Sequence, residues 1–396
     1  MKLYHNLVNA VLDGLSKIFT DLEHADKVIE RLLKLDPRWG SRDRRFIAET
    51  IYDVVRWRRW LAAVTNTSEN NLEAMVAAYL VWRYNELPEW QIFTNYQKDK
   101  IFNDLQADRF SRNIRMSIPD WLDELGDSEL GTLWPQELEA LNKPAPVHLR
   151  VNTLKIDRQK LLQHLKEESI EARALDHPTS ALELLERKNI FRSKAFQAGL
   201  FEVQDAASQQ VAVFLNPQNG ERIVDACAGA GGKSLHLSSI MGNTGKIVAM
   251  DTASWKLDEL KKRARRAGCS NIETRIIDGT KTIKRIENSA DRLLLDVPCS
   301  GLGVLRRNPD AKWKLSAESI EQTKKQQNEI LNHYHRILKP GGTMVYATCS
   351  ILPSENYLQV KAFLDTNPKF ILEEEKTLLP SKGTDGFYMA RIKKIE

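Results

Sequence analysis

Two cysteines that follow apolar segments of the chain could supply thiol chemistry. Cys299 comes just after the apolar residues 292–297, and Cys349 just after residues 343–348. Upstream, a glycine-rich loop at residues 227–233 follows a third apolar segment, and glycine lets a backbone approach a ligand closely. The combination suggests a nucleotide-like cofactor held beside two thiols. One reaction that needs both is the methylation of a pyrimidine carbon.

Carbon 5 of cytosine is a poor nucleophile, and a thiolate can activate it. When the thiolate adds to carbon 6, the ring becomes an enamine that can attack a methyl group. An acid at the N3 side of the ring would assist this addition. Afterwards the proton on carbon 5 must leave and the thiolate must be eliminated. One cysteine can therefore add while a second group manages release, and both thiols must be accessible and activated.

Other cofactor classes fit the glycine-rich loop less well. Gly232, Lys233 and Ser234 match the end of a Walker phosphate-binding loop, but Cys227 stands where that loop requires its first glycine. A nicotinamide cofactor could use the loop together with Asp251. However, the two downstream cysteines have no natural place in hydride transfer, so the sequence favours neither a nucleotide triphosphatase nor a dehydrogenase.

Acidic residues end the two apolar segments that follow the loop. Asp251 lies 19 residues after Gly232, where its carboxylate can accept hydrogen bonds from ribose hydroxyls. Asp278 ends the next segment and is placed to meet the adenine side of the same ligand. In a mainly parallel sheet, ligands bind beyond the carboxyl ends of the strands. These residues, the loop, Asp296 and the two cysteines all fall at that predicted edge.

The order of the segments predicts three domains. Residues 1–125 show apolar residues at helical spacing, and residues 126–205 contain a proline-rich linker followed by a small α+β unit with strands near 148–155 and 170–175. From 206 to 396, apolar strands alternate with helices, which predicts an α/β fold with a mainly parallel sheet. The expected strands are 222–226, 246–251, 273–277, 292–297 and 343–348, and the main helices are 254–267 and 317–338.

The remaining features of the composition exclude several classes of protein. The four cysteines form no C-x-x-C pair, Cys269 and Cys227 are expected to be packed rather than reactive, and the eight histidines show no zinc pattern. No apolar run is long enough to cross a membrane, and the first residues lack a secretion signal. We expect a cytoplasmic monomer with reduced thiols and no metal.

Basic residues next to tryptophans could contact RNA, although such a cluster is often only a solvated face. The formal net charge is only +5, so this argument depends on local clusters. Guanidinium groups pair with phosphates and stack on bases. The candidate RNA contacts are Arg56, Arg58 and Arg59 beside Trp57 and Trp60, and Arg306, Arg307 and Lys312 beside Trp313.

At these motifs the chain resembles the Sun/Fmu (RsmB-type) family of S-adenosylmethionine-dependent RNA cytosine-5 methyltransferases. The resemblance covers nearly the whole length. It is carried by Asp296–Val–Pro–Cys–Ser–Gly–Leu–Gly–Val304 with Arg306–Arg–Asn–Pro–Asp310, by Ala347–Thr–Cys–Ser350, and by Phe201–Glu–Val–Gln–Asp–Ala–Ala–Ser208, Arg150–Val–Asn–Thr–Leu–Lys155 and Asp385–Gly–Phe–Tyr–Met–Ala390. The N-terminal residues are similar, less specifically, to a NusB-like helical domain.

The resemblance implies a Rossmann-like methyltransferase with a seven-stranded sheet, preceded by a helical NusB-like domain and a small RRM-like domain. It implies that Cys349 is the nucleophile, that Cys299 assists breakdown of the adduct, and that Asp296 lies near the base. The residues implied to bind S-adenosylmethionine are Cys227, Ala228, Gly229, Ala230, Gly231, Gly232, Lys233, Asp251, Asp278 and Asp296. Ala230 departs from the family pattern, which usually has proline there, so the loop loses a fixed φ.

The substrate implied by the resemblance is structured RNA, with small-subunit (16S) ribosomal RNA favoured. Transfer RNA is the alternative that keeps the same chemistry. A non-catalytic RNA-binding factor for ribosome assembly is the alternative from another class, and the intact pair of cysteines argues against it.

Overall fold

The computed structural model describes residues 3–395, which form two compact units. The helical unit comprises the chain up to Lys143 together with the segment Leu305–Ala317. The α/β unit comprises Pro144–Val304 and the chain from Glu318 onward. The segment Leu305–Ala317 therefore follows Cys299 closely in sequence but packs with the N-terminal helices. The boundaries predicted at residues 125 and 205 stay a prediction.

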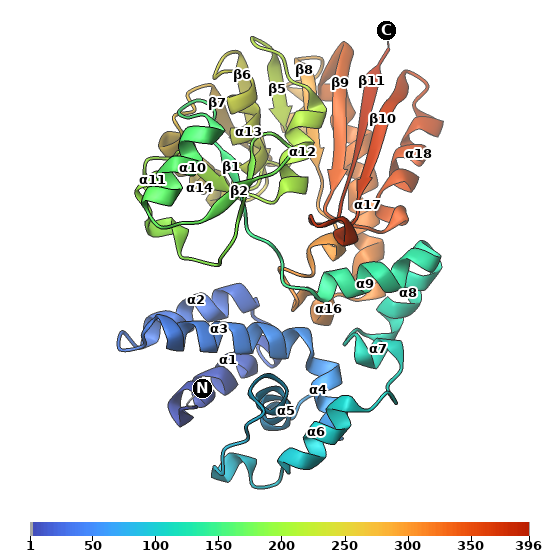
Figure 1. The fold of residues 1–396 in the computed structure, drawn as a ribbon. Helices are drawn as coiled ribbons and strands as arrows, with labels where there is room; N and C mark the ends of the chain where they lie inside the picture. Colours follow the sequence, from blue (N-terminus) through green and yellow to red (C-terminus); the bar gives the residue numbers. More distant parts are fainter. Residues whose placement is uncertain (1–2, 396) are drawn as a thin grey trace. The chain divides into compact units, whose positions relative to one another are not determined.

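The helical unit is built around a helix that is buried nearly all round. In α5 (Leu72–Tyr84) every residue from Ala74 to Val81 is buried, and the Asn71 side chain caps the helix by accepting a hydrogen bond from the Ala74 N–H. The other helices of this unit are α1 (His5–Phe19), α2 (Ala25–Leu35), α3 (Ser41–Arg56), α4 (Arg58–Thr65), α6 (Lys98–Gln106), α7 (Arg112–Arg115), α8 (Asp120–Leu130), α9 (Trp134–Asn142) and α16 (Ala311–Lys314) (Figure 1). Helices α1, α2, α3, α4 and α6 bury apolar residues in this core, and the remaining helices complete the unit.

A four-stranded antiparallel sheet opens the α/β unit. Its strand order is β2-β3-β1-β4, with α10 (Arg158–Glu167) between β1 and β2 in the chain and α11 (Lys194–Gln197) before β4. Because β3 lies between β1 and β2, these two strands run parallel without being neighbours, and the connection through α10 skips over one strand. The strands are β1 (His148–Val151), β2 (Ala172–Ala174), β3 (Ala181–Leu184) and β4 (Phe201–Val203).

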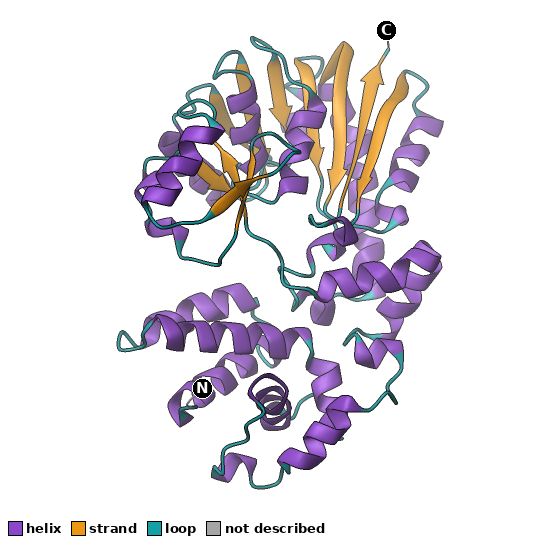
Figure 2. Cartoon of the chain, in the orientation of Figure 1, coloured by secondary structure: helices purple, strands orange, loops and turns teal. Residues whose placement is uncertain are grey.

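A seven-stranded sheet forms the centre of the α/β unit, in the order β10-β11-β9-β8-β5-β6-β7 (Figure 2). The pairs from β9 to β7 are parallel, and β11 is antiparallel to both of its neighbours. This confirms the predicted mainly parallel sheet. The strands are β5 (Arg222–Asp225), β6 (Lys246–Asp251), β7 (Ile272–Ile276), β8 (Ala290–Asp296), β9 (Leu338–Thr348), β10 (Phe370–Leu378) and β11 (Phe387–Lys394).

Two apolar cores lie on the two faces of this sheet, as the alternation along β8 shows. Leu293 and Leu295 belong to one core, whereas Leu294 belongs to the other, because successive side chains of a strand point to opposite faces. Both faces are therefore covered, as expected of a parallel sheet. The helices of this unit are α12 (Ala206–Leu215), α13 (Gly232–Ile240), α14 (Ser254–Ala267), α15 (Thr280–Lys284), α17 (Ala317–Tyr334) and α18 (Tyr357–Thr366).

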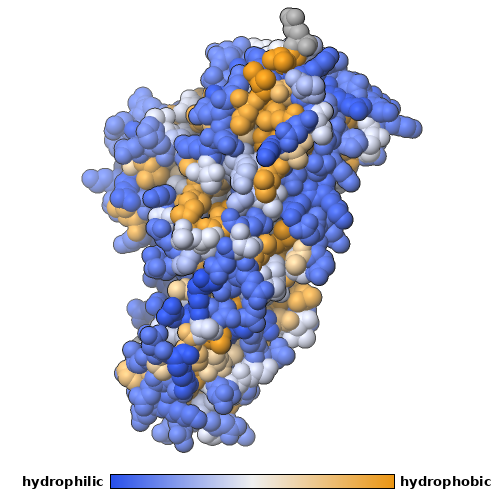
Figure 3. Space-filling model, turned by 90° about the vertical axis from the view of Figure 1, so that its right-hand side faces the viewer, coloured by the Kyte–Doolittle hydropathy of each residue, from blue (hydrophilic) through white to orange (hydrophobic). Residues whose placement is uncertain are grey.

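The edge strand β10 exposes both apolar and charged side chains. Ile371 and Leu372 are exposed, and the residues that follow are Glu373, Glu374, Glu375 and Lys376. Figure 3 shows orange hydrophobic surface below the grey atoms at the top of this view, and most of the surface around it is blue, that is, hydrophilic. Charges on an edge strand disfavour pairing with another chain.

Among residues 3–395, no helix combines the length and apolar character needed to cross a membrane.

Candidate active site

The loops that follow β5, β6, β8 and β9 bring the predicted site residues to the carboxyl edge of the sheet. The glycine-rich loop follows β5, Asp251 ends β6, Asp296 ends β8 and Cys349 follows β9. Since β8 and β9 are parallel neighbours with Asp296 opposite Ala347, the turns that carry Cys299 and Cys349 emerge side by side.

The two thiols are in contact. The Sγ atoms of Cys299 and Cys349 lie 3.1 Å apart, and both residues are free cysteines with partly exposed surfaces. The hydrogen bond with Cys349, burial, and the charges of Cys349 and Glu355 raise the pKa of Cys299 well above its ordinary value. Cys299 therefore holds its proton at neutral pH. The pair can place one sulfur on a substrate atom while the other donates or accepts a proton beside it.

A lysine and a carboxylate face each other beside the thiols. The Nζ of Lys233 lies 2.5 Å from Oδ2 of Asp296, and it also lies 5.3 Å from the centre of the Phe387 ring. Burial lowers the pKa of Lys233, but the charges of Asp296, Cys349 and Asp225 and the hydrogen bond to Asp296 outweigh it, so the pKa is raised. Lys233 thus supplies a fixed positive charge among these acidic groups.

The glycine-rich loop is tied to the end of β6. The Gly229 N–H donates to Oδ2 of Asp251 at 2.9 Å, and the Ala253 N–H donates to the other oxygen at 2.8 Å. Gly229 and Gly231 have φ values of +53° and +85°, which L side chains rarely adopt. A Cβ on Gly231 would also lie 2.4 Å from Cγ of Leu260. Glycine is therefore required at position 231 by both conformation and space.

Two arginines that the sequence analysis missed hold the same loop. Arg263 donates to the carbonyl oxygen of Ala230 at 2.8 Å, and Arg150 donates to that of Gly232 at 2.5 Å. The loop therefore has two side-chain anchors where the family's proline is absent. Arg150 is the first residue of the motif at 150–155, but the residues around it gave no sign that its hydrogen-bond partner Gly232 lies 82 positions away in the chain.

A cavity of about 640 Å³ opens beside this loop. Its lining includes Ala226, Cys227, Asp251, Ile277, Pro298 and Tyr334, so it reaches from the loop to the residue before Cys299. The S-adenosylmethionine implied by the resemblance fits this lining, because a carboxylate able to bind hydroxyls, apolar side chains and Gly279, a glycine of positive φ, converge there. Asp278 is exposed and bonds to Thr282; its neighbours Ile277 and Gly279 line the cavity, but Asp278 itself does not.

A Gly231→Ala variant should bind S-adenosylmethionine at least about tenfold more weakly than the natural chain, because the added Cβ must push the loop away from Leu260. Isothermal titration calorimetry measures the affinity. Gly220→Ala is the matched control, since Gly220 also has a positive φ but has open space around its Cβ position. An equal loss in both variants would contradict the role of the close approach.

Asp225 gives the α/β unit a dependence on pH. Burial, opposed by the hydrogen bond from Ser234 and aided by the charge of Asp296, raises the pKa of Asp225 to about 7. Between about pH 4 and pH 7 the folded chain binds this proton and the unfolded chain does not, so stability falls as pH rises through that window.

Relative to an Asp225→Asn variant, the free energy of unfolding of the natural chain should therefore fall by on the order of 2 kcal/mol between pH 5 and pH 8. Urea denaturation of both proteins at several pH values measures the difference. Parallel profiles for the two proteins would contradict the raised pKa.

The candidate RNA contacts all belong to the helical unit, where each makes contacts within the protein. Arg56 and Lys312 are buried; Lys312 donates to the Arg56 carbonyl oxygen at 2.8 Å, and Arg56 donates to that of Arg306 at 3.1 Å. Burial lowers the pKa of Lys312 well below its ordinary value. Arg306 is also buried, and Arg307 is partly exposed. A role of these residues in binding RNA stays a prediction.

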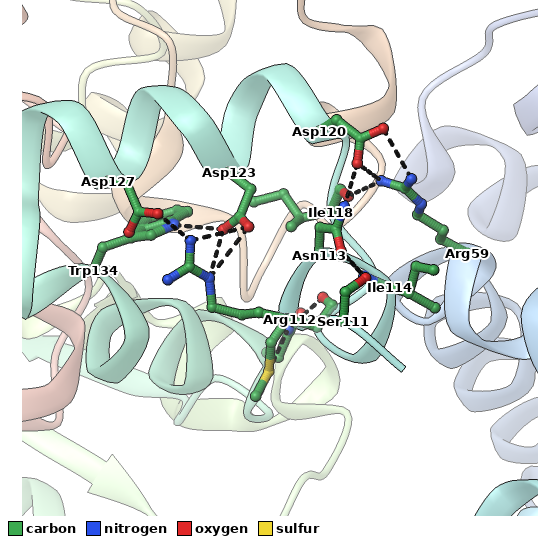
Figure 4. Close-up of polar contacts among 12 residues, drawn as sticks. Arg59, Ser111, Arg112, Asn113, Ile114, Ile118, Asp120, Asp123, Asp127 and Trp134 are labelled. Carbon is green, nitrogen blue, oxygen red and sulfur yellow. Dashed lines mark hydrogen bonds and ion pairs between the residues drawn. The ribbon is translucent and has the colours of Figure 1, made fainter. Parts of the chain in front are cut away.

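Arg58 and Arg59 are partly exposed but also have protein partners. Arg58 lies 4.2 Å from the centre of the Phe19 ring, and Arg59 makes two hydrogen bonds to the Asp120 carboxylate, at 2.7 and 3.0 Å (Figure 4). In the same region Asp123 accepts hydrogen bonds from Arg112 and from the Trp134 indole. The nearby Trp57 and Trp60 rings pack against each other and against Trp82.

Comparison with known proteins gives matches over most of the chain. The family model for 16S rRNA methyltransferase RsmB/F matches residues 212–393, and the model for a ferredoxin-like domain of RsmF/B-like methyltransferases matches residues 118–190. The probable ribosomal RNA small subunit methyltransferase B of Synechocystis sp. is 35% identical over 314 residues, covering 74% of this chain and 70% of that protein.

Two further matches agree with these. Ribosomal RNA small subunit methyltransferase B of Proteus mirabilis is 37% identical over 294 residues, which cover 74% of this chain and 69% of that protein. The crystal structure of PH0851 covers 100% of both chains with a TM-score of 0.85 at 23% identity. At this level of identity the structural match supports the fold alone.

Proposed function

Because the chain belongs to the RsmB/F family of 16S rRNA methyltransferases, whose cofactor is S-adenosylmethionine, we propose that it methylates carbon 5 of a cytosine in small-subunit ribosomal RNA through a covalent adduct. The single observation that carries the chemistry is the contact of Cys299 and Cys349, 3.1 Å apart at the carboxyl edge of the sheet. Methylation of an exocyclic amine or a ribose hydroxyl needs no thiol, whereas activation of carbon 5 needs one that can add to carbon 6.

The steps assign one role to each thiol. The Cys349 thiolate would bond to carbon 6, which makes the electron pair of the C5–C6 double bond available at carbon 5. Carbon 5 would then bond to the methyl carbon as the methyl–sulfur bond of the donor breaks, with that electron pair leaving on the donor sulfur as a thioether. The proton on carbon 5 then passes to a base, the double bond re-forms, and the Cys349 thiolate leaves. Cys299 serves this release step, since its sulfur lies 3.1 Å from that of Cys349.

Asp296 and Lys233 support the addition. S-adenosylmethionine, when bound, supplies an electrophilic methyl group. Asp296 is the last residue of β8, three residues before Cys299, and its carboxylate can accept a hydrogen bond from the exocyclic amine beside N3 of the ring. Lys233 fixes the Asp296 carboxylate by their 2.5 Å contact and balances the negative charge that the thiolate brings to this edge.

Methyl transfer to defined RNA tests this function. The protein should transfer labelled methyl groups to unmodified 16S ribosomal RNA or to small subunits that lack the modification, and bisulfite sequencing should locate one new 5-methylcytosine. Unmodified transfer RNA is the parallel substrate. Labelling of transfer RNA alone would contradict the proposal that ribosomal RNA is the substrate. Labelling that leaves the bisulfite profiles unchanged would contradict the proposal that carbon 5 of cytosine is methylated.

A further inference from the structure

A buried carboxylate lies behind the two thiols. Glu355 has no exposed surface, and its Oε1 accepts hydrogen bonds from the Ser300 N–H at 2.8 Å and from the Gln327 side chain at 3.0 Å. Its Oε2 accepts from the hydroxyls of Ser300 and Ser350, each at 2.5 Å. A carboxylate has only acceptor sites, so four converging donors satisfy it without a lysine or arginine in direct contact.

Three of these four donor groups belong to the two loops that carry the thiols. Ser300 follows Cys299 directly, and Ser350 follows Cys349 directly. The two serine hydroxyls also lie 3.2 Å apart. One carboxylate therefore connects the residues next to both sulfurs, although the two cysteines are 50 positions apart in the chain.

The residues on the other side of each cysteine are also held, by Gln327 and by Asn356, which follows Glu355 in the chain. Gln327 of α17 donates to the carbonyl oxygen of Pro298 at 2.9 Å, so Cys299 is flanked by two anchored residues. Asn356, the neighbour of Glu355, accepts from the Thr348 hydroxyl at 2.5 Å and donates to the Ser350 carbonyl oxygen at 3.0 Å, so Cys349 is flanked in the same way. The Tyr346 hydroxyl donates to the carbonyl oxygen of Glu355 at 2.7 Å, which attaches the short turn Pro353–Glu355 to β9.

We propose that Glu355 is a positioning residue that sets the separation of the Cys299 and Cys349 sulfurs. A buried carboxylate is costly unless it is fully hydrogen-bonded, so its donors are held firmly, and the loops that supply them are held with it. The negative charge of Glu355 also contributes to the raised pKa of Cys299. The inference rests on the proposed function in one respect: release of an adduct from Cys349 by Cys299 needs both sulfurs beside the same ring.

The separation of the thiols can be measured without RNA. Dithiobis(nitrobenzoate) first labels one thiol, releasing one thionitrobenzoate; the second thiol then displaces the other, leaving a disulfide between the two cysteines. Peptide mapping by mass spectrometry distinguishes the bridge between Cys299 and Cys349 from singly labelled peptides. In the natural chain the bridge should form directly after the first labelling.

In Glu355→Ala, bridging should slow by about tenfold or more and kcat for methyl transfer should fall by about 100-fold, with the affinity for S-adenosylmethionine unchanged, since misplacement by about 1 Å costs this much. Glu355→Gln keeps one acceptor oxygen toward the N–H donors. Its bridging rate and kcat should therefore lie between those of the natural chain and those of Glu355→Ala. Asp291→Ala is the control, because Asp291 also accepts hydrogen bonds from Arg222 and Lys339 but lies at the opposite edge of the sheet.

The result that would overturn the inference is a natural bridging rate in Glu355→Ala, or a loss of kcat that Asp291→Ala reproduces. Should Glu355→Ala not fold, a natural bridging rate in Glu355→Gln would overturn it equally. Failure of the proposed function is distinguishable, because it would appear as absence of methyl transfer by the natural chain while the bridging assay still reports on the thiols.

Discussion

Replacing Cys299 with alanine should trap the enzyme on its RNA. With Cys349 present, the addition to carbon 6 and the methyl transfer can still proceed, but the group that serves release is missing, so the covalent adduct accumulates. The two sulfurs are 3.1 Å apart, which places the lost group directly beside the adduct. A protein–RNA band that survives denaturation, and that requires both unmodified RNA and S-adenosylmethionine, measures the effect.

The matching variant is Cys349→Ala, which should form no adduct and should lose turnover by at least about 1,000-fold, the scale of losing a covalent nucleophile. Because the two cysteines have similar exposure and contact each other, each variant controls for the other. An adduct in Cys349→Ala and none in Cys299→Ala would reverse the assignment of the two roles.

Replacing Lys233 with methionine should lower kcat at neutral pH by about 100-fold, the usual scale for removing one preorganised charge from an active site. The charges of Asp296, Cys349 and Asp225 all favour the charged form of Lys233, so its ammonium balances negative charge at this edge of the sheet. Steady-state kinetics of methyl transfer measures the loss.

The control for this variant is Lys339→Met. Lys339 forms a comparable ion pair, 2.6 Å from Asp291, but at the opposite edge of the sheet. Its loss should leave kcat unchanged. Calorimetry with S-adenosylmethionine completes the test, since a loss of turnover in Lys233→Met that lost donor affinity fully explains would contradict the electrostatic role.

The sequence predicts the local part of the site well, because apolar strand segments and the polar residues that end them are read from short stretches. The predicted strand 246–251 and helix 254–267 coincide with β6 and α14. The placement of Cys299 and Cys349 at one edge also followed, since parallel strands with covered faces put their carboxyl ends together. The edge strand β10 was not predicted, because Glu373–Lys376 interrupts its apolar pattern.

What the sequence could not show are the contacts made across long separations. Arg150 reaches Gly232, Arg263 reaches Ala230, and Glu355 reaches Ser300, and no local pattern distinguishes these residues from ordinary surface charges. Lys312 is the converse case. It lies in a basic stretch typical of a nucleic-acid contact, yet its side chain is buried against Arg56 in the helical unit.

The identity of the sulfur that bonds to the base is the central claim, and an RNA with 5-fluorocytidine at the target position tests it most directly. Fluorine at carbon 5 leaves no proton to remove, so the natural enzyme should stay bonded to the RNA after one methyl transfer. Digestion and mass spectrometry then identify the modified peptide. The nucleotide should be attached to Cys349; attachment to Cys299, or no attached nucleotide despite methyl transfer to normal RNA, would contradict the account.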